Sequence, residues 1–339
     1  MIITKTPFRM SFFGGGTDIK EFYEEYGGSV LSTTFDKYCY VTVRHLPRFF
    51  DYTSEFVYAK TERVKDVEKI EHPLIRNLMK FKEMHEIRLS YEADLPARTG
   101  LGTSSSFAVG MLNAFYGMKG KRVDKKRLAD EAIYAERVLC KEAGGIQDQI
   151  AAAFGGLNRI DMTKDGYKVN PIIISNQKKK EFNSNLMLFF TGFSRFSSDV
   201  QQQTKKNISE KIKQLQEMKS LVSEAENILT DTSKDINEFG RLLDYTWKLK
   251  KGISSNISTD NIDEIYKKAI SAGALGGKLL GAGGGGFLLF YVEQEKQSKV
   301  LDALKGLLYV PFSFESDGTQ VIYFKAEDYE IPERFRKEG

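Results

Sequence analysis

The sequence predicts an α+β protein built as two lobes. Stretches rich in β-branched and aromatic residues come first and stretches with helical spacing follow. The same order then occurs a second time, without strict alternation. A chain of 339 residues is long enough to bury two hydrophobic cores. We therefore expect a first domain over residues 1–175 and a second over residues 176–339, joined by a linker near Ile174 to Phe182.

Strands are expected first. The segments Val30 to Phe35 and Cys39 to Val43 are rich in β-branched and aromatic residues, and the turn-like pair Asp36-Lys37 separates them. Phe56 to Ala59 and Ile87 to Tyr91 have the same character. The first third of the chain is therefore predicted to contain several short strands.

Helices are expected next, because apolar residues recur at helical spacing. His72 to His85 is the first such stretch, Phe107 to Tyr116 is apolar enough to be buried, and Asp124 to Leu139 is amphipathic with Asp124 as its N-cap. A further helix is predicted from Ile146 to Phe154, where Gly155-Gly156 ends it.

The second half of the chain again contains both predicted strands and predicted helices. Strands are predicted at Leu186 to Phe190, Phe287 to Val292 and Val321 to Phe324, and a helical stretch at Ile262 to Ala272. A long polar helix is expected over roughly Asp199 to Leu229. A coiled coil would account for its length, but one amphipathic helix packed on a sheet is the simpler interpretation.

Composition and charge exclude several classes of function. Lys and Arg number 50 against 46 Asp and Glu, a net charge of +4 that leaves no case for a nucleic-acid surface. No apolar run approaches the ~20 residues of a membrane-spanning helix, and the first residues lack the apolar core of a signal peptide. Two distant cysteines, Cys39 and Cys140, indicate a reducing compartment without a disulfide framework. We expect a cytoplasmic protein.

The segment Leu95 to Ser106 is the strongest chemical signal. Gly100 and Gly102 flank Leu101, and four hydroxyl residues follow at the start of a predicted helix. Glycine allows the backbone to approach a ligand closely, and the N–H groups of a helix start attract phosphate oxygens. A capped helix is the ordinary alternative, but one hydroxyl would suffice for a cap. The segment therefore predicts a triphosphate cradle.

Two familiar nucleotide motifs are excluded. Around Gly277-Lys278, Ala272 stands where the Walker pattern needs its first glycine, and Leu279 where it needs a hydroxyl. Gly281 to Gly286 satisfies G-x-G-x-x-G, but a helical stretch precedes it and a strand follows, the reverse of a dinucleotide site.

Two further clusters contain charged residues that could take part in catalysis. Arg9, a permanent cation, precedes the glycine run Gly14 to Gly16 and the acceptor Asp18. Taken alone, this stretch would be read as a bulged turn with a surface ion pair. Glu136 and Asp148 bracket the pair Gly144-Gly145. Phosphoryl transfer needs a phosphate cradle, magnesium, a cation and a proton acceptor, and these clusters can supply them.

Together with the late glycine-rich loop Lys278 to Gly286, these clusters resemble the GHMP kinase superfamily in order and spacing over nearly the whole chain. The resemblance implies a two-domain fold. Its N-terminal, ATP-binding domain is like ribosomal protein S5 domain 2, and its C-terminal domain is ferredoxin-like. ATP and substrate would meet between them.

The resemblance also implies roles for individual residues. Ser104 and Glu136 match the magnesium ligands, and Asp148 matches the catalytic aspartate. Arg9 matches the basic residue near the attacking hydroxyl, and Asp18 the aspartate that holds sugar hydroxyls. The expected ATP-binding residues are Pro96, Gly100, Leu101, Gly102, Thr103, Ser104, Ser105 and Ser106. The expected substrate-binding residues are Gly15, Gly16, Thr17, Asp18, Gly145, Arg195 and Gly283.

The chain departs from the family pattern in places. Thr103 and Ser106 stand where Ser and Ala are usual, and the spacing from Glu136 to Asp148 is one residue longer than in some relatives.

Within the superfamily, the segment Phe8 to Asp18 most resembles the bacterial D-glycero-D-manno-heptose 7-phosphate kinases and the kinase domain of fucokinases. The first resemblance implies phosphorylation of the anomeric C1 hydroxyl to a 1,7-bisphosphate, on the way to nucleotide-activated heptose for surface polysaccharide. The alternatives are an L-fucose- or galactose-type 1-kinase, or a catalytically silent sugar sensor. ATP, Mg²⁺ and a small sugar phosphate are the implied partners, and the chain could be a monomer or a homodimer.

The 7-phosphate of such a substrate needs fixed cations. Arg195, flanked by Ser194, Ser197 and Ser198 near the start of the long helix, is our candidate, because a helix N-terminus and a guanidinium both favour an anion. An ordinary surface pair between Arg195 and Asp199 is an equally good interpretation.

Overall fold

Two β-sheets form the centre of the structure, a computed structural model that describes residues 1–97, 99–192, 211–253, 257–281 and 283–326. The larger sheet contains β1 (Ile2–Phe13), β2 (Gly28–His45), β3 (Ser54–Val57), β4 (Thr61–Val64), β5 (Ile87–Ala93), β6 (Asn158–Thr163), β7 (Gly166–Pro171), β12 (Phe314–Glu315) and β13 (Gln320–Phe324). The smaller sheet contains β8 (Leu186–Gly192), β9 (Gly276–Leu279), β10 (Gly286–Tyr291) and β11 (Leu308–Tyr309).

The strand order is not the chain order. The larger sheet runs β13-β1-β2-β5-β3-β4, with β6 and β12 also paired to β2, and β7 paired to β6. The smaller sheet runs β11-β8-β10-β9. Of the pairs that the structure describes, β3 with β5 is parallel and the others are antiparallel.

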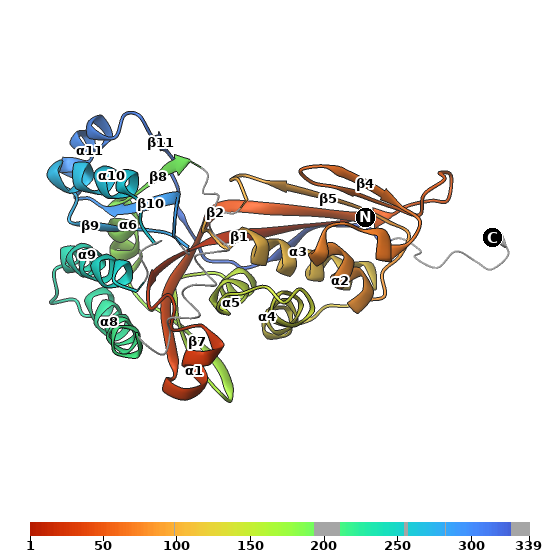
Figure 1. The fold of residues 1–339 in the computed structure, drawn as a ribbon, viewed down its shortest axis with the longest axis horizontal. Helices are drawn as coiled ribbons and strands as arrows, with labels where there is room; N and C mark the ends of the chain where they lie inside the picture. Colours follow the sequence, from red (N-terminus) through yellow and green to blue (C-terminus); the bar gives the residue numbers. More distant parts are fainter. Residues whose placement is uncertain (98, 193–210, 254–256, 282, 327–339) are drawn as a thin grey trace.

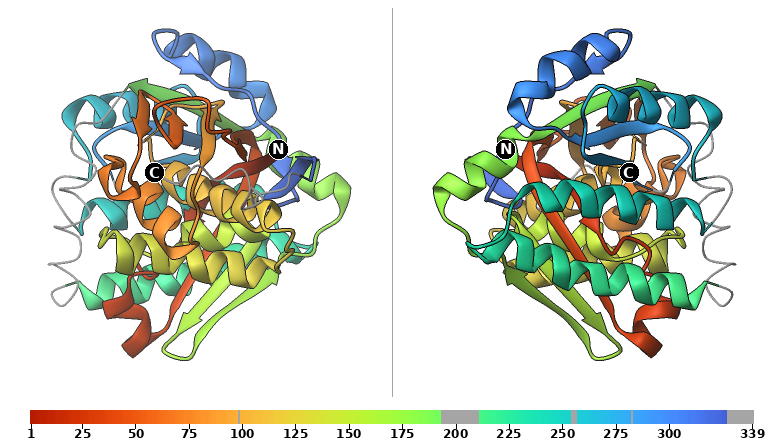
Figure 2. Two further views of the ribbon diagram at one scale, coloured as in Figure 1. Left: turned by 90° about the vertical axis from the view of Figure 1, so that its right-hand side faces the viewer. Right: turned by 90° about the vertical axis from the view of Figure 1, so that its left-hand side faces the viewer.

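The helices form two groups that follow each other along the chain (Figure 1). The first group comprises α1 (Lys20–Tyr26), α2 (Pro73–Phe81), α3 (Thr103–Met118), α4 (Lys125–Tyr134) and α5 (Gln147–Phe154). The second group comprises α6 (Asn176–Ser184), α8 (Ile212–Thr230), α9 (Asn237–Lys251), α10 (Asp260–Ser271) and α11 (Gln297–Ala303). Helix α3 packs on β1 and β2, whereas α9 packs on β9 and lies beside α8 (Figure 2). None of the helices in the described part of the chain is long and apolar enough to cross a lipid bilayer.

A shared core joins the two sheets. Phe12 of β1, Phe182 of α6 and Phe239 of α9 are all fully buried, and their rings pack with centroids 4.6 to 5.5 Å apart. Leu289 of β10 belongs to the same core. The end of β1 is therefore held against the second half of the chain, just beyond Arg9.

The predicted turn at Asp36-Lys37 is wrong. Strand β2 runs unbroken from Gly28 to His45, and its register on β1 passes from Phe35 to Tyr38 between consecutive residues of β1. The two residues are a bulge. Asp36 instead pairs with Ser313, whose N–H donates to Asp36 Oδ1 at 2.9 Å. This partner lies too far along the chain for the local sequence to indicate it.

The other predicted elements agree with the structure within a few residues at most of their ends. Asp124 caps α4 through a 2.7 Å bond from the Arg127 N–H, and α5 ends at Gly155 as expected. Helix α4 continues into a π-helical turn, Ala135–Leu139. Of the long polar helix, the structure describes α8, and the predicted part before residue 211 lies outside the described residues. The predicted α+β class is confirmed.

The link between the halves differs from the expected linker. Helix α6 occupies most of the segment 174–182 and buries Phe182 completely. Strands β12 and β13, from the end of the chain, return to pair with β2 and β1. The division at residue 175 therefore stays a prediction.

Candidate active site

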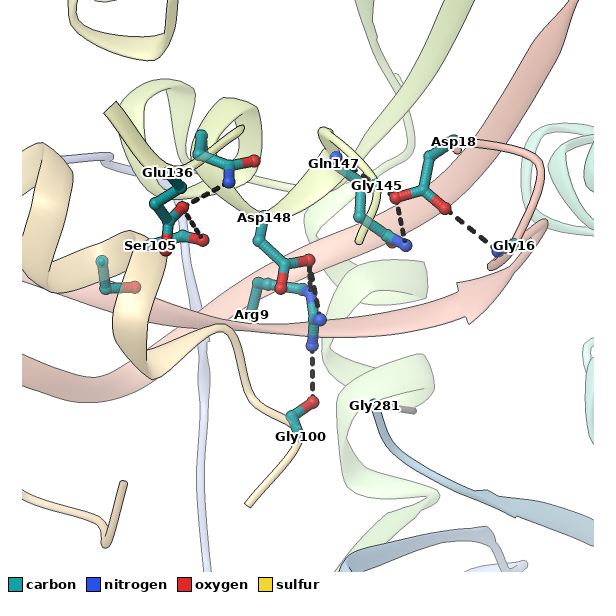
Figure 3. A network of polar contacts seen from close by, with 12 residues as sticks. Arg9, Gly16, Asp18, Gly100, Ser105, Glu136, Gly145, Gln147, Asp148 and Gly281 are labelled. Carbon is teal, nitrogen blue, oxygen red and sulfur yellow. Dashed lines mark hydrogen bonds and ion pairs between the residues drawn. The ribbon is translucent and has the colours of Figure 1, made fainter. Parts of the chain in front are cut away.

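Arg9 and Asp148 form the centre of the site. The Arg9 Nε and Nη2 atoms each lie 2.7 Å from Asp148 Oδ1, and Nη1 donates to the carbonyl of Gly100 at 2.7 Å (Figure 3). Arg9 is 5% exposed, whereas the Asp148 side chain is 24% exposed. Asp148 Oδ2 accepts no hydrogen bond from the part of the chain that the structure describes. One carboxylate oxygen is thus anchored while the other is available to a ligand.

Local structure explains this placement. Asp148 lies in the first turn of α5, where the unpaired N–H groups of a helix start favour a negative charge. Arg9 is in β1, and its backbone N–H donates to the carbonyl of Leu101 at 3.1 Å. The side chain and backbone of Arg9 together tie the Gly100–Gly102 turn to β1 and α5.

Asp18 occupies the second part of the site. Its Oδ1 accepts the Gly16 N–H at 3.0 Å, and its Oδ2 accepts the Gln147 side-chain amide at 3.0 Å (Figure 3). Asp18 is 3% exposed. Burial raises the pKa of this carboxyl, the charge of Asp148 raises it further, and the hydrogen bonds from Gly16 and Gln147 oppose both effects.

Gly145 makes this arrangement possible. A Cβ at Gly145 would lie 1.8 Å from Asp18 Oδ2, far inside any real contact distance. The glycine is needed here for close approach, since it is not among the residues with positive φ.

Polar atoms beside Asp18 suit a polyhydroxyl ligand. Ser11 Oγ and Gln147 Oε1 are buried and have no hydrogen-bond partner among the described residues. Ser11 Oγ and the Gln147 amide nitrogen would lie 3.8 and 3.9 Å from a Cβ built on Gly15, so both flank the space that this glycine leaves. Unpaired buried polar groups are costly, and sugar hydroxyls could satisfy them.

The predicted triphosphate cradle has the expected local geometry. Gly100 and Gly102 adopt left-handed φ values of 84° and 72°, and α3 begins immediately afterwards at Thr103. Helix α3 has 16 residues, so its first N–H groups can attract an anion. Ser104 is exposed at this helix start. These features fit a bound triphosphate.

Glu136 is hydrogen-bonded to Ser105, and its expected role as a magnesium ligand with Ser104 stays a prediction. It is 1% exposed, and its Oε2 accepts bonds from Ser105 Oγ at 2.6 Å and from the Gln149 amide. Among the described residues, Ser105 and not Ser104 is the serine that contacts Glu136. Gln149 Oε1 is buried and has no hydrogen-bond partner in the part of the chain that the structure describes. Carboxylate, amide and hydroxyl oxygens are the donors that Mg²⁺ prefers, so this set fits the metal.

Two lysines were missed by the sequence interpretation. The half-buried Lys250 of α9 donates to the carbonyls of Gly281 at 2.5 Å and Leu279 at 3.4 Å. Lys278 of β9 is 2% exposed and donates to the carbonyl of Phe12 at 2.7 Å. Lys278 is the first residue of the late glycine-rich loop, and the loop motif implies no role for it. Nothing in the local sequence distinguishes Lys250 from its neighbours.

Other predicted residues lie at the edges of the site. The Thr17 side chain is fully buried and bonds the carbonyls of Gly14 and Ser29, so it supports the glycine loop from behind. A Cβ on Gly283 would meet the backbone of Ile257 at 2.8 Å. The carbonyl of Pro96 accepts the hydroxyl of Thr99. Arg195 and its serine neighbours lie outside the described residues.

The chain has many relatives among known proteins. Residues 68–156 match the family described as GHMP kinases N terminal domain, and residues 218–310 match GHMP kinases C terminal. The chain is 30% identical over 335 residues to D-glycero-alpha-D-manno-heptose 7-phosphate kinase of Campylobacter jejuni, covering 94% of this chain and 98% of that one. It is 24% identical to galactokinase of Pyrococcus furiosus, over 93% of this chain and 96% of that one.

A solved structure is similar over the same extent. It is described as a D-glycero-D-manno-heptose 1-phosphate kinase from Bacteroides thetaiotaomicron, with a TM-score of 0.76 at 25% identity. The match covers 96% of this chain and 100% of that one. Both halves of the fold are therefore shared.

Proposed function

The chain belongs to the GHMP kinases, and from this premise we propose that it phosphorylates the C1 hydroxyl of D-glycero-D-manno-heptose 7-phosphate with ATP. The family and its relatives make the chain an ATP-dependent sugar kinase. The choice of heptose 7-phosphate is supported by the Campylobacter jejuni relative, which matches nearly end to end. The product would be the 1,7-bisphosphate, an intermediate toward nucleotide-activated heptose.

The proposal is best supported by the different partners of two adjacent residues, Gln147 and Asp148. Gln147 bonds Asp18, on the side that suits sugar hydroxyls, and Asp148 bonds Arg9, beside the predicted triphosphate cradle (Figure 3). Because they are neighbours in the first turn of α5, a sugar held by Asp18 would have a hydroxyl near Asp148.

The proposed chemistry is an in-line transfer. The C1 oxygen attacks the terminal phosphorus of ATP, the bond from that phosphorus to the ADP oxygen breaks, and the C1 proton passes to Asp148. Arg9 holds the carboxylate in place through Oδ1 and leaves Oδ2 for the proton. Asp18 orients the sugar.

Magnesium would be held by Glu136 with a serine of the α3 start. When bound, the ion would neutralise phosphate charge. Ser105 already contacts Glu136, and Ser104 is the exposed hydroxyl at the same helix start. Both serines therefore remain candidates, and the role of Ser104 is a proposal.

We expect Glu136→Ala to raise sharply the Mg²⁺ concentration needed for half-maximal activity, since magnesium has few protein ligands. Ser104→Ala should have a weaker effect. The measurement is a magnesium titration of initial rate, with circular dichroism to verify folding, because Glu136 is buried. An unchanged requirement in Glu136→Ala would move the ligand role to a neighbour, with Glu142 tested first.

We expect Arg195→Ala to raise the KM for heptose 7-phosphate far more than the KM for ATP, because a guanidinium fork suits a phosphate. Steady-state kinetics with each substrate varied in turn give both constants. An equal effect on both constants, or good turnover of unphosphorylated heptose by the wild type, contradicts a 7-phosphate site at Arg195.

A coupled ADP-release screen tests the function itself. Heptose 7-phosphate, L-fucose, galactose, homoserine and mevalonate are offered at equal concentration with ATP and Mg²⁺. The highest kcat/KM should belong to heptose 7-phosphate. Preference for fucose or galactose would replace the substrate within the same enzyme class, and no turnover of any sugar would favour a sensor.

A further inference from the structure

Three cationic side chains gather near the active site from three separate elements. Arg9 comes from β1, Lys250 from α9 and Lys278 from β9. Asp148 neutralises Arg9 through the bonds described above. Neither lysine forms an ion pair with a carboxylate among the described residues, and both ammonium groups donate to backbone carbonyls.

This gathering of positive charge is unfavourable by itself. Burial and, to a smaller extent, the charge of Arg9 lower the pKa of Lys250 to about 8, against the opposing charge of Asp18. Burial, Lys250 and Arg9 together hold the pKa of Lys278 well below its usual range. Carbonyl acceptors orient an ammonium group but do not cancel its charge. An anion bound here would relieve the repulsion.

The position of Lys250 indicates that this anion is a phosphate group of ATP. Its ammonium bonds the carbonyl of Gly281, and Gly281 packs so closely on Gly100 that a Cβ there would lie 2.3 Å from the Gly100 Cα. Gly100 in turn accepts a bond from Arg9 (Figure 3). Lys250 is therefore connected through two touching backbone segments to the turn that precedes α3, on the side of Arg9 and Asp148.

The two lysines differ in what they can reach. Lys278 is almost fully buried and bonds Phe12, so it fastens β9 to β1. Lys250 is half-buried, and its helix ends one residue later, at Lys251. Lys250 is the one of this pair that retains solvent access.

We propose that Lys250 is a catalytic cation that contacts the terminal phosphoryl group of bound ATP and strengthens that contact during transfer to the sugar. This inference rests on the proposed kinase reaction, but not on the identity of the sugar. Its ammonium would leave the Gly281 carbonyl for the phosphoryl oxygens, whose charge is stabilised in the transition state. Lys250 would thus bind the phosphoryl oxygens, which Arg9 is less free to do because it is anchored to Asp148.

The first test needs no sugar. Calorimetry compares the binding of Mg·ATP and Mg·ADP to the wild type, Lys250→Met and the control Lys248→Met. Lys248 is exposed on the same helix and pairs with Asp244. Lys250→Met should weaken ATP binding more than ADP binding, whereas Lys248→Met should change neither. Equal weakening of both nucleotides, or no weakening, overturns the proposal.

The second test uses the best sugar of the screen, whichever it is. Lys250→Met should lower kcat at least about tenfold, the size expected for one charge-assisted contact, with little change in the KM for the sugar. A raised KM for a phosphorylated sugar with kcat unchanged would place the sugar's own phosphate at Lys250 and overturn the proposal. A failed screen leaves the nucleotide-binding comparison intact.

The third test is a pH profile. The groups that face Lys250 are Arg9, Asp18 and Lys278. Arg9 is a permanent cation, burial raises the pKa of Asp18, and burial together with Lys250 and Arg9 lowers the pKa of Lys278. Lys250 must be protonated to act, so kcat/KM for ATP should be full below pH 8 and fall above it. Lys250→Arg should retain activity to higher pH. An identical alkaline limb in Lys250→Arg rejects the role.

Discussion

Replacing Asp148 with asparagine is expected to lower kcat by about 10²–10⁴-fold, the usual contribution of a general base. Asparagine keeps the shape of the side chain and can still accept from Arg9 through its carbonyl oxygen. It cannot take a proton from the sugar, and it removes the negative charge. An anomeric hydroxyl is more acidic than a simple alcohol, so we expect the lower end of this range.

The measurement is single-turnover and steady-state kinetics at saturating ATP, with nucleotide binding measured separately. ATP binding should persist in Asp148→Asn. The matched control is Asp302→Asn, an exposed aspartate on α11, which should retain wild-type kcat. Near-wild-type kcat in a folded Asp148→Asn would reduce Asp148 to a structural partner of Arg9.

Replacing Gly145 with alanine is expected to lower kcat/KM for the sugar by about 100-fold, the cost of roughly 1 Å of misplacement in a positioned site. The new methyl group would lie 1.8 Å from Asp18 Oδ2, so the carboxylate or the backbone of α5 must move. Either movement breaks the Asp18–Gln147 contact and displaces Asp148, three residues further along the chain from Gly145.

Gly306→Ala is the control for this substitution. A Cβ at Gly306 meets nothing within 4 Å, and its φ is not in the positive range. Thermal unfolding of both variants separates lost stability from lost positioning. We expect Gly145→Ala to bind ATP normally and the sugar poorly. Normal sugar kinetics in a folded Gly145→Ala would show that Asp18 does not hold the sugar.

The sequence by itself determined the parts of this protein whose signals are local. The glycines at 100 and 102, the hydroxyl-rich start of α3, the Asp124 cap and the α5 start at residues 147–148 all follow from short-range chemistry. Each depends on residues within a few positions of one another, where backbone conformation and helix-end hydrogen bonding decide the structure. The order of these motifs also identified the family.

The tertiary structure decided whatever depends on partners far apart in the chain. Asp36 bulges because Ser313 bonds it, Glu136 takes Ser105 because the π-helical turn packs against α3, and Lys250 meets Gly281 because α9 packs on β9. The sequence of a helix with lysines at 248, 250 and 251 does not indicate which of them lies at an active site. Only the packing of the second half of the chain against β1 brings Lys250 near Arg9. The burial of a side chain and the charges around it depend on the assembled fold and not on any one segment.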